Sequence, residues 1–528
     1  VAAIILAGAL VGSPLFVLLA AAAISCFYFL AEGYTTIASF QGIVVRFGDL
    51  GEKEPLLAIV FFMLSGTIMA RGEISSRLVE LSRALVGWMP GGLPVSAVLA
   101  CTLFASISGS TPATVVAIGG MLGPTLIKQG YPERFSHGLL MSAGSLGVLI
   151  PPSIPMILYP IINQTEFIEV ERLFAAGLGP GLLLAAIFAT QSVIQGVRNK
   201  APTEPFEIAR VKSALMNGFW ALLFPVTILG GIYGGILTAV EASAFSVVYA
   251  LIVELFIHRA LKLADLPSII KETTLLLGSL LVIMVSAFAF TEYLSAEQVP
   301  NALAEWIQSF DLGPIGFLLA VNLLLLFVGM AMDMLSAMFV FIPLFAPIAS
   351  SFGIDPVHFG IIFIVNLEIG YLTPPVGLNL FVGSSLFKRS IGHVIRSVVP
   401  FIGAMFIGLM IITYVPAFSV GFADFLLGRE VPESVPLEDA ADTPEAPPGV
   451  MSIEEMMREA MGEGGGEGAS SGRVMSIEEM MREAEESLEA DDDLFGDEDD
   501  LFGDEDASDA EENTDADAGQ NADESAPE

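Results

Sequence analysis

The sequence predicts an all-α polytopic membrane protein built from two inverted-topology repeats, on the strength of three observations. Hydrophobic residues make up 54% of the 528 residues, and the mean hydropathy of +0.72 is typical of a chain that lies mostly in a bilayer. The segment Gly147-Val148-Leu149-Ile150-Pro151-Pro152 returns in the second half of the chain as Gly370-Tyr371-Leu372-Thr373-Pro374-Pro375. The Lys and Arg residues of the loops change sides between the two copies.

Apolar segments of about 20 residues, the length that crosses a bilayer, account for much of the chain. The first, residues 3–31, lacks a basic region and a cleavage site, so we expect a membrane span rather than a signal peptide. Residues 71–87 and 297–310 are amphipathic and charged, which favours arm helices at the membrane surface or, alternatively, ordinary loop helices. The other predicted spans cover residues 54–70, 171–196, 214–236, 240–258, 270–292 and 397–418.

Two regions, 94–162 and 313–387, are apolar yet rich in Gly, Ser, Thr and Pro. Each is too long for one span and too interrupted for two, which predicts a re-entrant hairpin followed by a helix broken at its proline pair. A proline inside a helix costs about 3 kcal/mol, and a break in hydrocarbon persists only where it is buried in protein or lines a wet cavity. Broken helices at corresponding places in two halves indicate the binding site of a transporter.

The loop charges predict that the two halves are inverted. The loop before the first broken helix carries Lys128 and Arg134, whereas residues 353–356 before the second carry no basic residue. Residues 163–171, after the first broken helix, include three Glu and no basic residue, whereas Lys388 and Arg389 follow the second. Because Lys and Arg mark the cytoplasmic side, this reversal is typical of inverted repeats in secondary transporters.

These patterns divide the chain into six parts. The tail holds 35 of the 59 acidic residues and repeats residues 450–460 at 474–484 and 493–499 at 500–506, which predicts disorder, although short docking helices remain an alternative. We predict scaffold helices and a first arm in 1–93, a first transport half in 94–162, scaffold helices and a second arm in 163–312, a second transport half in 313–387, a last span in 388–428 and the acidic tail in 429–528.

Composition and motifs argue against several classes of function. Outside the tail the chain has no basic excess that would neutralise nucleic-acid phosphates. Two cysteines and four histidines without ligand spacing predict neither disulfides nor a transition-metal site, and we expect no cofactor beyond a coupling ion. The sequence contains no nucleophile elbow, no His-Glu-x-x-His and no Walker A motif, so we expect a transporter and not an enzyme.

The first hairpin region holds a polar stretch, residues 106–114, that predicts a tip facing a cavity. Sodium needs oxygen ligands, which unwound main chain supplies, and half-helix N-termini attract anionic groups of a substrate. Tight packing of small residues is the alternative. Asp333 and Glu368 are ionisable at membrane depth, which leaves a proton or cation role open, whereas Glu241 is expected to make structural hydrogen bonds.

Several motifs resemble the large membrane subunit of tripartite ATP-independent periplasmic (TRAP) transporters, in order over about residues 1–420. Three features depart from the family. Pro112 stands where a small polar or aliphatic residue is usual, Thr238-Ala239-Val240-Glu241-Ala242 stands where Thr-Pro-Thr-Glu-Ala is usual, and Asp333 and Glu368 are charged. The matching motifs are Ser108-Gly109-Ser110-Thr111-Pro112-Ala113-Thr114, Gly130-Tyr131 and residues 147–155, 173–181, 353–360 and 373–380.

The resemblance implies a sodium-driven importer of an organic acid in the bacterial inner membrane, with an elevator motion. It implies two partners, a periplasmic substrate-binding protein and a small four-helix membrane subunit. It also implies sodium sites built mostly from main-chain carbonyls, and a substrate bound beside them. The first sodium site would use Ser106, Ser108, Gly109, Gly147, Ile150 and Pro152, the second Gly329, Gly370, Thr373 and Pro375, and the substrate would lie near Ser110, Thr114, Ser153 and Asn379.

Two other functions remain open at this stage. One is a membrane scaffold that recruits partners through its acidic repeat tail, and the other is a stand-alone sodium/anion symporter. No core side chain distinguishes a C4-dicarboxylate from another organic acid, because specificity in this arrangement rests largely with the binding protein.

Overall fold

The computed structural model describes residues 15–29, 53–163, 165–310, 313–374 and 377–429. Within these ranges the chain is helical and has no β-strand, which agrees with the predicted all-α class. The acidic repeats after residue 429 and the first residues of the N-terminal span lie outside the described residues.

The first half of the chain forms helices that follow the predicted segments. α2 (Leu15–Phe29) lies inside the predicted first span, and α4 (Pro55–Arg71) bends by 70° into α5 (Ile74–Val86), which occupies the predicted first arm. The hairpin region and the next span then form α6 (Gly92–Ser108), α7 (Thr111–Lys128), α8 (Glu133–Ser145), the short 3-10 turn η1 (Leu146–Val148), α9 (Ile154–Ile162) and α10 (Val170–Asn199).

The rest of the chain repeats this order after a central group of helices. The central group is α11 (Ile208–Asn217), which bends by 62° into α12 (Phe219–Tyr233), then α13 (Ala239–Leu251), η2 (Ile252–Ile257), η3 (Leu263–Asp265) and α14 (Leu266–Ala296). The second half is α15 (Val299–Gln308), α16 (Pro314–Ala331), α17 (Met334–Ser351), α18 (Pro356–Leu372), α19 (Leu378–Phe387), α20 (Ile391–Tyr414), η4 (Pro416–Phe418) and α21 (Val420–Leu426).

Six helical stretches among the described residues are long and apolar enough to cross a membrane. They are α10, α13 with η2, η3 with α14, α16, α17 and α20, and the bent pairs α4–α5 and α11–α12 qualify when each pair is taken together. By length and composition, α16 and α17 could each cross a membrane alone, whereas α6, the first helix of the other hairpin region, is too short to meet the same criterion. The chain is therefore polytopic, and the re-entrant character of its hairpins stays a prediction.

Both proline pairs interrupt a helix, as the sequence predicts. The first break separates the end of η1 at Val148 from the start of α9 at Ile154, and the second separates Leu372 of α18 from Leu378 of α19. Proline lacks the N–H that a helix needs and disfavours helical geometry in the residue before it, so two in succession end the helix.

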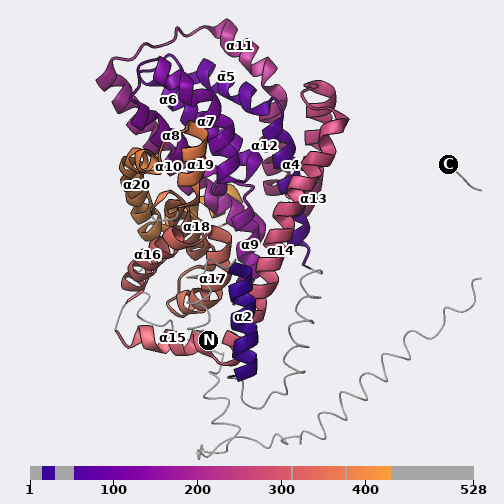
Figure 1. Ribbon diagram of the computed structural model, residues 1–528, viewed down its shortest axis with the longest axis vertical. Helices are drawn as coiled ribbons and strands as arrows, with labels where there is room; N and C mark the ends of the chain where they lie inside the picture. The colour runs from indigo at the N-terminus through magenta and orange to yellow at the C-terminus, as the bar shows by residue number, and fades with distance from the viewer. Residues whose placement is uncertain (1–14, 30–52, 164, 311–312, 375–376, 430–528) are drawn as a thin grey trace, which may run out of the picture. The chain divides into compact units, whose positions relative to one another are not determined.

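The helix bounds recur at the same interval as the two proline motifs, the interval from Gly147 to Gly370. α6 ends at Ser108 and α16 ends at Ala331, while α8 begins at Glu133 and α18 begins at Pro356. In Figure 1, α5, α6 and α7 lie towards the upper end of the bundle, whereas α15, α16 and α17 lie towards the lower end.

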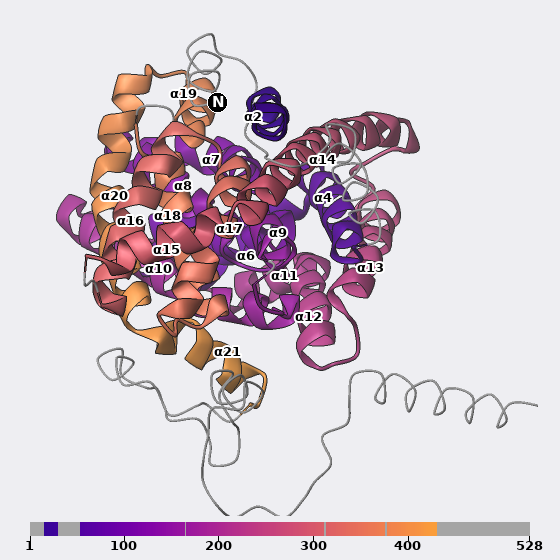
Figure 2. The same cartoon turned by 90° about the horizontal axis from the view of Figure 1, so that it is seen from below.

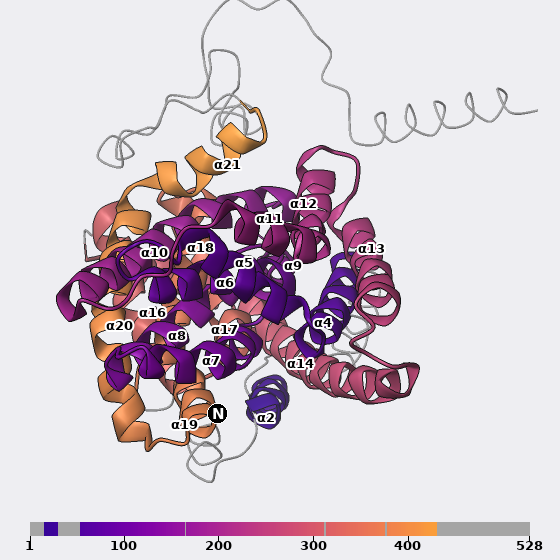
Figure 3. The same ribbon diagram turned by 90° about the horizontal axis from the view of Figure 1, so that it is seen from above.

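The helices form two flanks that meet at a shared core. In Figures 1, 2 and 3, α4, α12, α13 and α14 lie on one side, and α16, α18, α19 and α20 lie on the other. Fully buried aromatic side chains from α6, α9, α10 and α18 fill the space between them, among them Phe104, Tyr159, Phe174 and Phe363. α9 ends at Ile162, α19 at Phe387 and α21 at Leu426, and the division of the chain into six parts stays a prediction.

Candidate functional site

The polar stretch at residues 106–114 forms the turn between α6 and α7. Gly109 has φ +56°, in the left-handed region that glycine adopts without strain, and it ends α6. The hydroxyl groups of Ser108 and Thr114 are hydrogen-bonded at 2.8 Å across the turn. Ser106 is buried, and its hydroxyl donates to the carbonyl of Leu103 at 2.7 Å.

This turn lies directly against the first helix break. A Cβ on Gly109 would stand 2.8 Å from the carbonyl oxygen of Pro152, and a Cβ on Gly147 would stand 2.7 Å from that of Ser110. Only glycine allows two backbones to approach so closely. The turn and the break that hold the predicted first-site residues are therefore brought together, and the buried Ile150 side chain packs against Gly181 of α10.

A further backbone reaches the same turn from α4. A Cβ on Gly66 would stand 2.9 Å from the carbonyl oxygen of Ser108. The sequence analysis missed this neighbour, because one Ser-Gly pair inside an apolar span, Ser65-Gly66, is a weak signal. The turn is thus enclosed by α4 on one side and by the first break on the other.

In the second half of the chain, α16 and α18 meet through two glycines. A Cβ on Gly370 would stand 2.5 Å from the Cα of Gly329, so α16 and α18 touch backbone to backbone. Thr373 begins the second break; its hydroxyl donates to the carbonyl of Ile369 at 2.7 Å and its N–H donates to the carbonyl of Gly370 at 2.9 Å. Pro375, the fourth predicted member of this site, lies outside the described residues.

Asp333 and Glu241 act as helix caps. Asp333 Oδ1 accepts from the backbone N–H groups of Leu335 and Ser336, at 3.0 and 3.1 Å. Glu241 accepts from the N–H of Thr238 at 2.9 Å, and the Thr238 hydroxyl accepts from the N–H of Glu241 at 3.2 Å, a reciprocal capping box. The structural hydrogen bonds expected of Glu241 are confirmed, and a carboxylate that caps a helix has a structural reason to be charged.

The residues expected near the substrate are only partly brought together. A Cβ on Gly109 would stand 3.8 Å from the Cα of Ser153, and Thr114 bonds to Ser108, so these residues border the first turn. Asn379 is fully buried on α19, which packs against α7, α8, α18 and α20. Neither polar atom of its side chain has a hydrogen-bond partner among the described residues.

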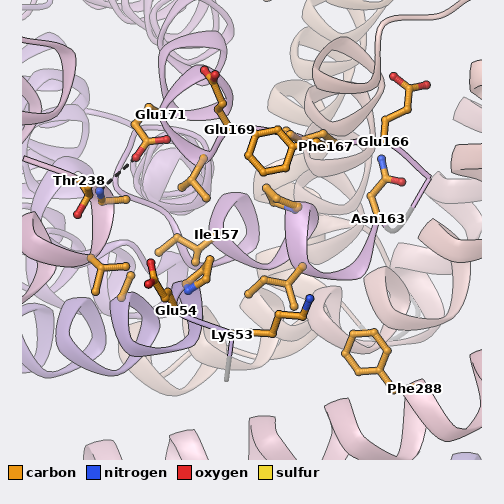
Figure 4. A pocket seen from close by; sticks show the side chains of 18 residues that line it. Lys53, Glu54, Ile157, Asn163, Glu166, Phe167, Glu169, Glu171, Thr238 and Phe288 are labelled. Carbon is orange, nitrogen blue, oxygen red and sulfur yellow. Dashed lines mark hydrogen bonds between the residues drawn. The ribbon is translucent and has the colours of Figure 1, made fainter. Parts of the chain in front are cut away.

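A cavity of about 970 Å³ lies beside the C-terminal part of α9 (Figure 4), and none of its lining residues belongs to the first turn. Glu54, Glu166, Glu169 and Glu171 line it, with Lys53 as the basic residue among its lining side chains. Figure 4 shows Glu171 beside Thr238. The Glu171 carboxylate accepts a hydrogen bond of 3.2 Å from the N–H of Ala239. An acidic concavity of this kind raises the local concentration of cations.

Helix ends of opposite polarity converge at the first turn. The C-terminus of α6 presents carbonyl groups that have no intrahelical partner, and the N-termini of α7 and α9 present free N–H groups. Carbonyl oxygens suit a hard cation such as sodium, and N–H groups suit an anion. The arrangement can therefore hold a cation and a carboxylate side by side without a buried charged side chain.

Comparison with known proteins gives matches over most of the chain. The family described as "Tripartite ATP-independent periplasmic transporter, DctM component" matches residues 2–418. The C4-dicarboxylate TRAP transporter large permease protein DctM of Pseudomonas aeruginosa is 41% identical over 389 residues, which cover 74% of this chain and 90% of that protein. The ectoine/5-hydroxyectoine TRAP transporter large permease protein UehC of Ruegeria pomeroyi is 38% identical over 378 residues, which cover 69% and 88%.

A likeness of fold extends to a solved structure. The YdaH transporter of Alcanivorax borkumensis superposes with a TM-score of 0.55 over 78% of this chain and 97% of that chain. The two sequences are 15% identical, so this likeness concerns the helix arrangement alone.

Proposed function

The chain belongs to the DctM component family of tripartite ATP-independent periplasmic transporters, and from this premise we propose that it imports an organic acid by sodium-coupled secondary transport. As a member of that family it is a large permease subunit of the inner membrane and not an enzyme. The family works with a small membrane subunit and a periplasmic binding protein. Because relatives at 38–41% identity are named C4-dicarboxylate permeases, a C4-dicarboxylate is the first candidate substrate.

The observation that carries the proposal is a close backbone contact, present in both halves of the chain, between a hairpin and the broken helix that follows it. Gly109 and Gly147 join the first turn to the first break, and Gly329 and Gly370 join α16 to the helix that ends at the second break. Each glycine pair allows main-chain carbonyls to converge, which is how sodium is held at the unwound helices of transporters. The predicted second-site positions each follow a first-site position at the interval that separates the two proline motifs.

Inverted repeats and an elevator motion are part of the same proposal. The recurrence of helix bounds at the interval of the proline motifs supports the repeats, as does the position of the two hairpins towards opposite ends in Figure 1. In a transporter built from two inverted repeats, one repeat opens the binding site to one side of the membrane while the other repeat closes it to the opposite side. We infer that the hairpins and broken helices move together against α4, α12, α13 and α14.

The test is uptake by the chain reconstituted in liposomes with its binding protein and small membrane subunit. Replacing external sodium by potassium should abolish accumulation of a radiolabelled C4-dicarboxylate, and uptake that continues unchanged would remove the coupling proposal. Uptake by the large subunit without the binding protein would favour a stand-alone symporter. Loss of all uptake on deletion of residues 430–528 would favour a scaffold that works through its tail.

A further inference from the structure

Three side chains at one end of α8 and α20 form a cluster that is not part of either predicted sodium site. Glu133 and His137 lie one turn apart on α8, and His393 lies at the start of α20. One ligand atom from each lies within 4.8 Å of those of the other two. The spacing of Glu133 and His137 is visible in the sequence, but nothing local connects either of them to His393, so the sequence analysis missed the cluster.

The two histidines have nitrogen atoms without partners. The side chain of His137 is buried, and its Nδ1 has no hydrogen-bond partner among the described residues; the same holds for Nε2 of His393. Buried polar atoms are nearly always paired, because leaving one unpaired is unfavourable. Phe387 stacks on the His137 ring at 4.1 Å and so fixes the plane of that ring without satisfying its nitrogen.

We propose that Glu133, His137 and His393 bind a divalent transition-metal ion, for which Zn²⁺ is the best match. Zinc is held by imidazole nitrogen and carboxylate oxygen, and three protein ligands leave a fourth position for water. Magnesium and calcium prefer oxygen alone, so two imidazoles select against them. Tetrahedral zinc needs its ligand atoms roughly 3.3 Å apart, so each side chain moves inward by about 1 Å.

The backbone around the cluster is held closely enough to support such a site. α8 and α20 pack against each other (Figures 1 and 3). A Cβ on Gly138, next to His137, would stand 2.1 Å from the carbonyl oxygen of Ser397. The inward shift that zinc requires therefore falls on the side chains, most readily on the half-buried ones of Glu133 and His393, and not on the helices.

Arg389 competes with the metal for Glu133. Its Nε donates to Glu133 Oε1 at 2.5 Å, and the Arg389 side chain is 52% exposed, so it can turn into solvent when zinc binds. Neighbouring basic residues, Arg134 and Lys388, add repulsion. The affinity for zinc should therefore rise when Arg389 is replaced by a neutral residue. A histidine pair with a purely structural role would give no such rise.

The ion would join the first half of the chain to the second on the cytoplasmic side. Lys128, Arg134, Lys388 and Arg389 lie at the ends of α7, α8 and α19 or directly beside them, and positively charged helix ends and loops mark the cytoplasmic side. Zinc bound here would brace α8 against α20, and so raise the thermal stability of the chain.

The experiment measures zinc binding to the full-length, tag-free chain in detergent after treatment with EDTA. Equilibrium dialysis against ZnCl₂ with excess Mg²⁺ should give one strongly bound zinc per chain and a higher Tm. Second-layer changes at metal sites cost about 10–100-fold in affinity, so His393→Asn and Glu133→Gln should each weaken binding at least about tenfold. Arg389→Gln should tighten it.

His258→Asn is the matched control, since Glu254 is the single carboxylate neighbour described for that buried histidine. Every variant keeps the acidic tail, so weak cation binding by the tail cancels in the comparison. The Tm without metal reports whether each variant folds. Zinc binding that survives both His393→Asn and Glu133→Gln, or no binding above the Mg²⁺ background in the parent chain, would overturn the proposal.

Discussion

Ser145 donates a hydrogen bond of 2.7 Å from its hydroxyl to Oε1 of Glu368, and the two residues stand 223 positions apart. Both side chains are fully buried, one on α8 and the other on α18. In a pair of repeats related by a two-fold axis, a residue touches its own counterpart only beside that axis. The bond therefore supports an axis that passes between α8 and α18, next to both breaks.

We expect Ser145→Ala to destabilise the chain more than Glu368→Gln does. Removing the hydroxyl leaves a buried carboxyl oxygen of Glu368 without its hydrogen-bond donor, which costs about 1–3 kcal/mol, whereas glutamine keeps an acceptor for Ser145. Thermal unfolding in detergent measures the difference. The opposite ranking would mean that the charge of Glu368, and not its hydrogen bond, stabilises this region.

Glu368→Gln also tests the coupling ion. If sodium alone drives uptake through main-chain carbonyls, the variant should keep sodium-dependent uptake in liposomes. Loss of uptake, in a variant whose Tm is unchanged, would instead indicate that the carboxylate carries a coupling proton or cation.

Gly109→Ala should weaken sodium binding at the first site, with Gly130→Ala as its matched control. Both glycines have positive φ, so both variants incur about 1–2 kcal/mol of backbone strain. A Cβ on Gly109 meets Pro152, whereas a Cβ on Gly130 has no atom within 4 Å. The extra crowding of about 1–3 kcal/mol corresponds to a roughly 5- to 150-fold rise in the sodium concentration for half-maximal uptake.

Equal losses in Gly109→Ala and Gly130→Ala would assign the effect to strain and remove the case for a contact between the turn and the break.

Much of this arrangement is readable in the sequence, because prolines and glycines act locally. Pro151-Pro152 and Pro374-Pro375 end helices wherever they stand. The polar stretch at 106–114 forms a turn because Gly109 adopts the left-handed conformation that ends α6. Apolar length likewise places the spans, from α4 to α20, close to their observed bounds.

Contacts between distant segments were not predictable in this way. Arg172 on α10 bonds to Asp424 at 3.2 Å and pairs with Asp355 at 3.3 Å, which ties α10 to α21 and to the start of α18. Hydrophobic periodicity reports which face of a helix is buried but not which helix covers it. For the same reason the approach of Gly66 to the first turn and the meeting of His137 with His393 required the structure.

Gly370→Ala should impair the second site, with Gly278→Ala as its control. A Cβ on Gly370 would stand 2.5 Å from the Cα of Gly329, so α16 and α18 must separate, at a cost of about 1–3 kcal/mol. Gly278 lies in α14 with no atom within 4 Å of an added Cβ, so alanine there should be neutral or stabilising by up to about 1 kcal/mol. Sodium-dependent uptake and Tm measure both effects; full uptake in Gly370→Ala would exclude the second site from coupling.

Glu204 joins α5 to α11 through ion pairs whose strength depends on pH. Glu204 accepts from Arg83 of α5 at 2.6 Å and from Arg210 of α11 at 2.5 Å. Burial acts to raise the pKa of the Glu204 carboxyl, but the hydrogen bonds from the two guanidinium groups outweigh it and lower the pKa below its ordinary value. Its stabilising effect is therefore complete above the unfolded pKa of about 4.3 and is lost as the pH falls through the lower folded value.

Glu204→Gln should accordingly lower the Tm at pH 7, by the equivalent of about 1 kcal/mol for a partly exposed network. The gap between the parent chain and the variant should narrow as the pH falls below about 4. Glu207→Gln, an exposed acid in the same connection, should leave the Tm unchanged at both pH values. A gap for Glu204→Gln that stays constant from pH 7 to pH 3.5 would show that the side chain stabilises α5 through packing and not through its charge.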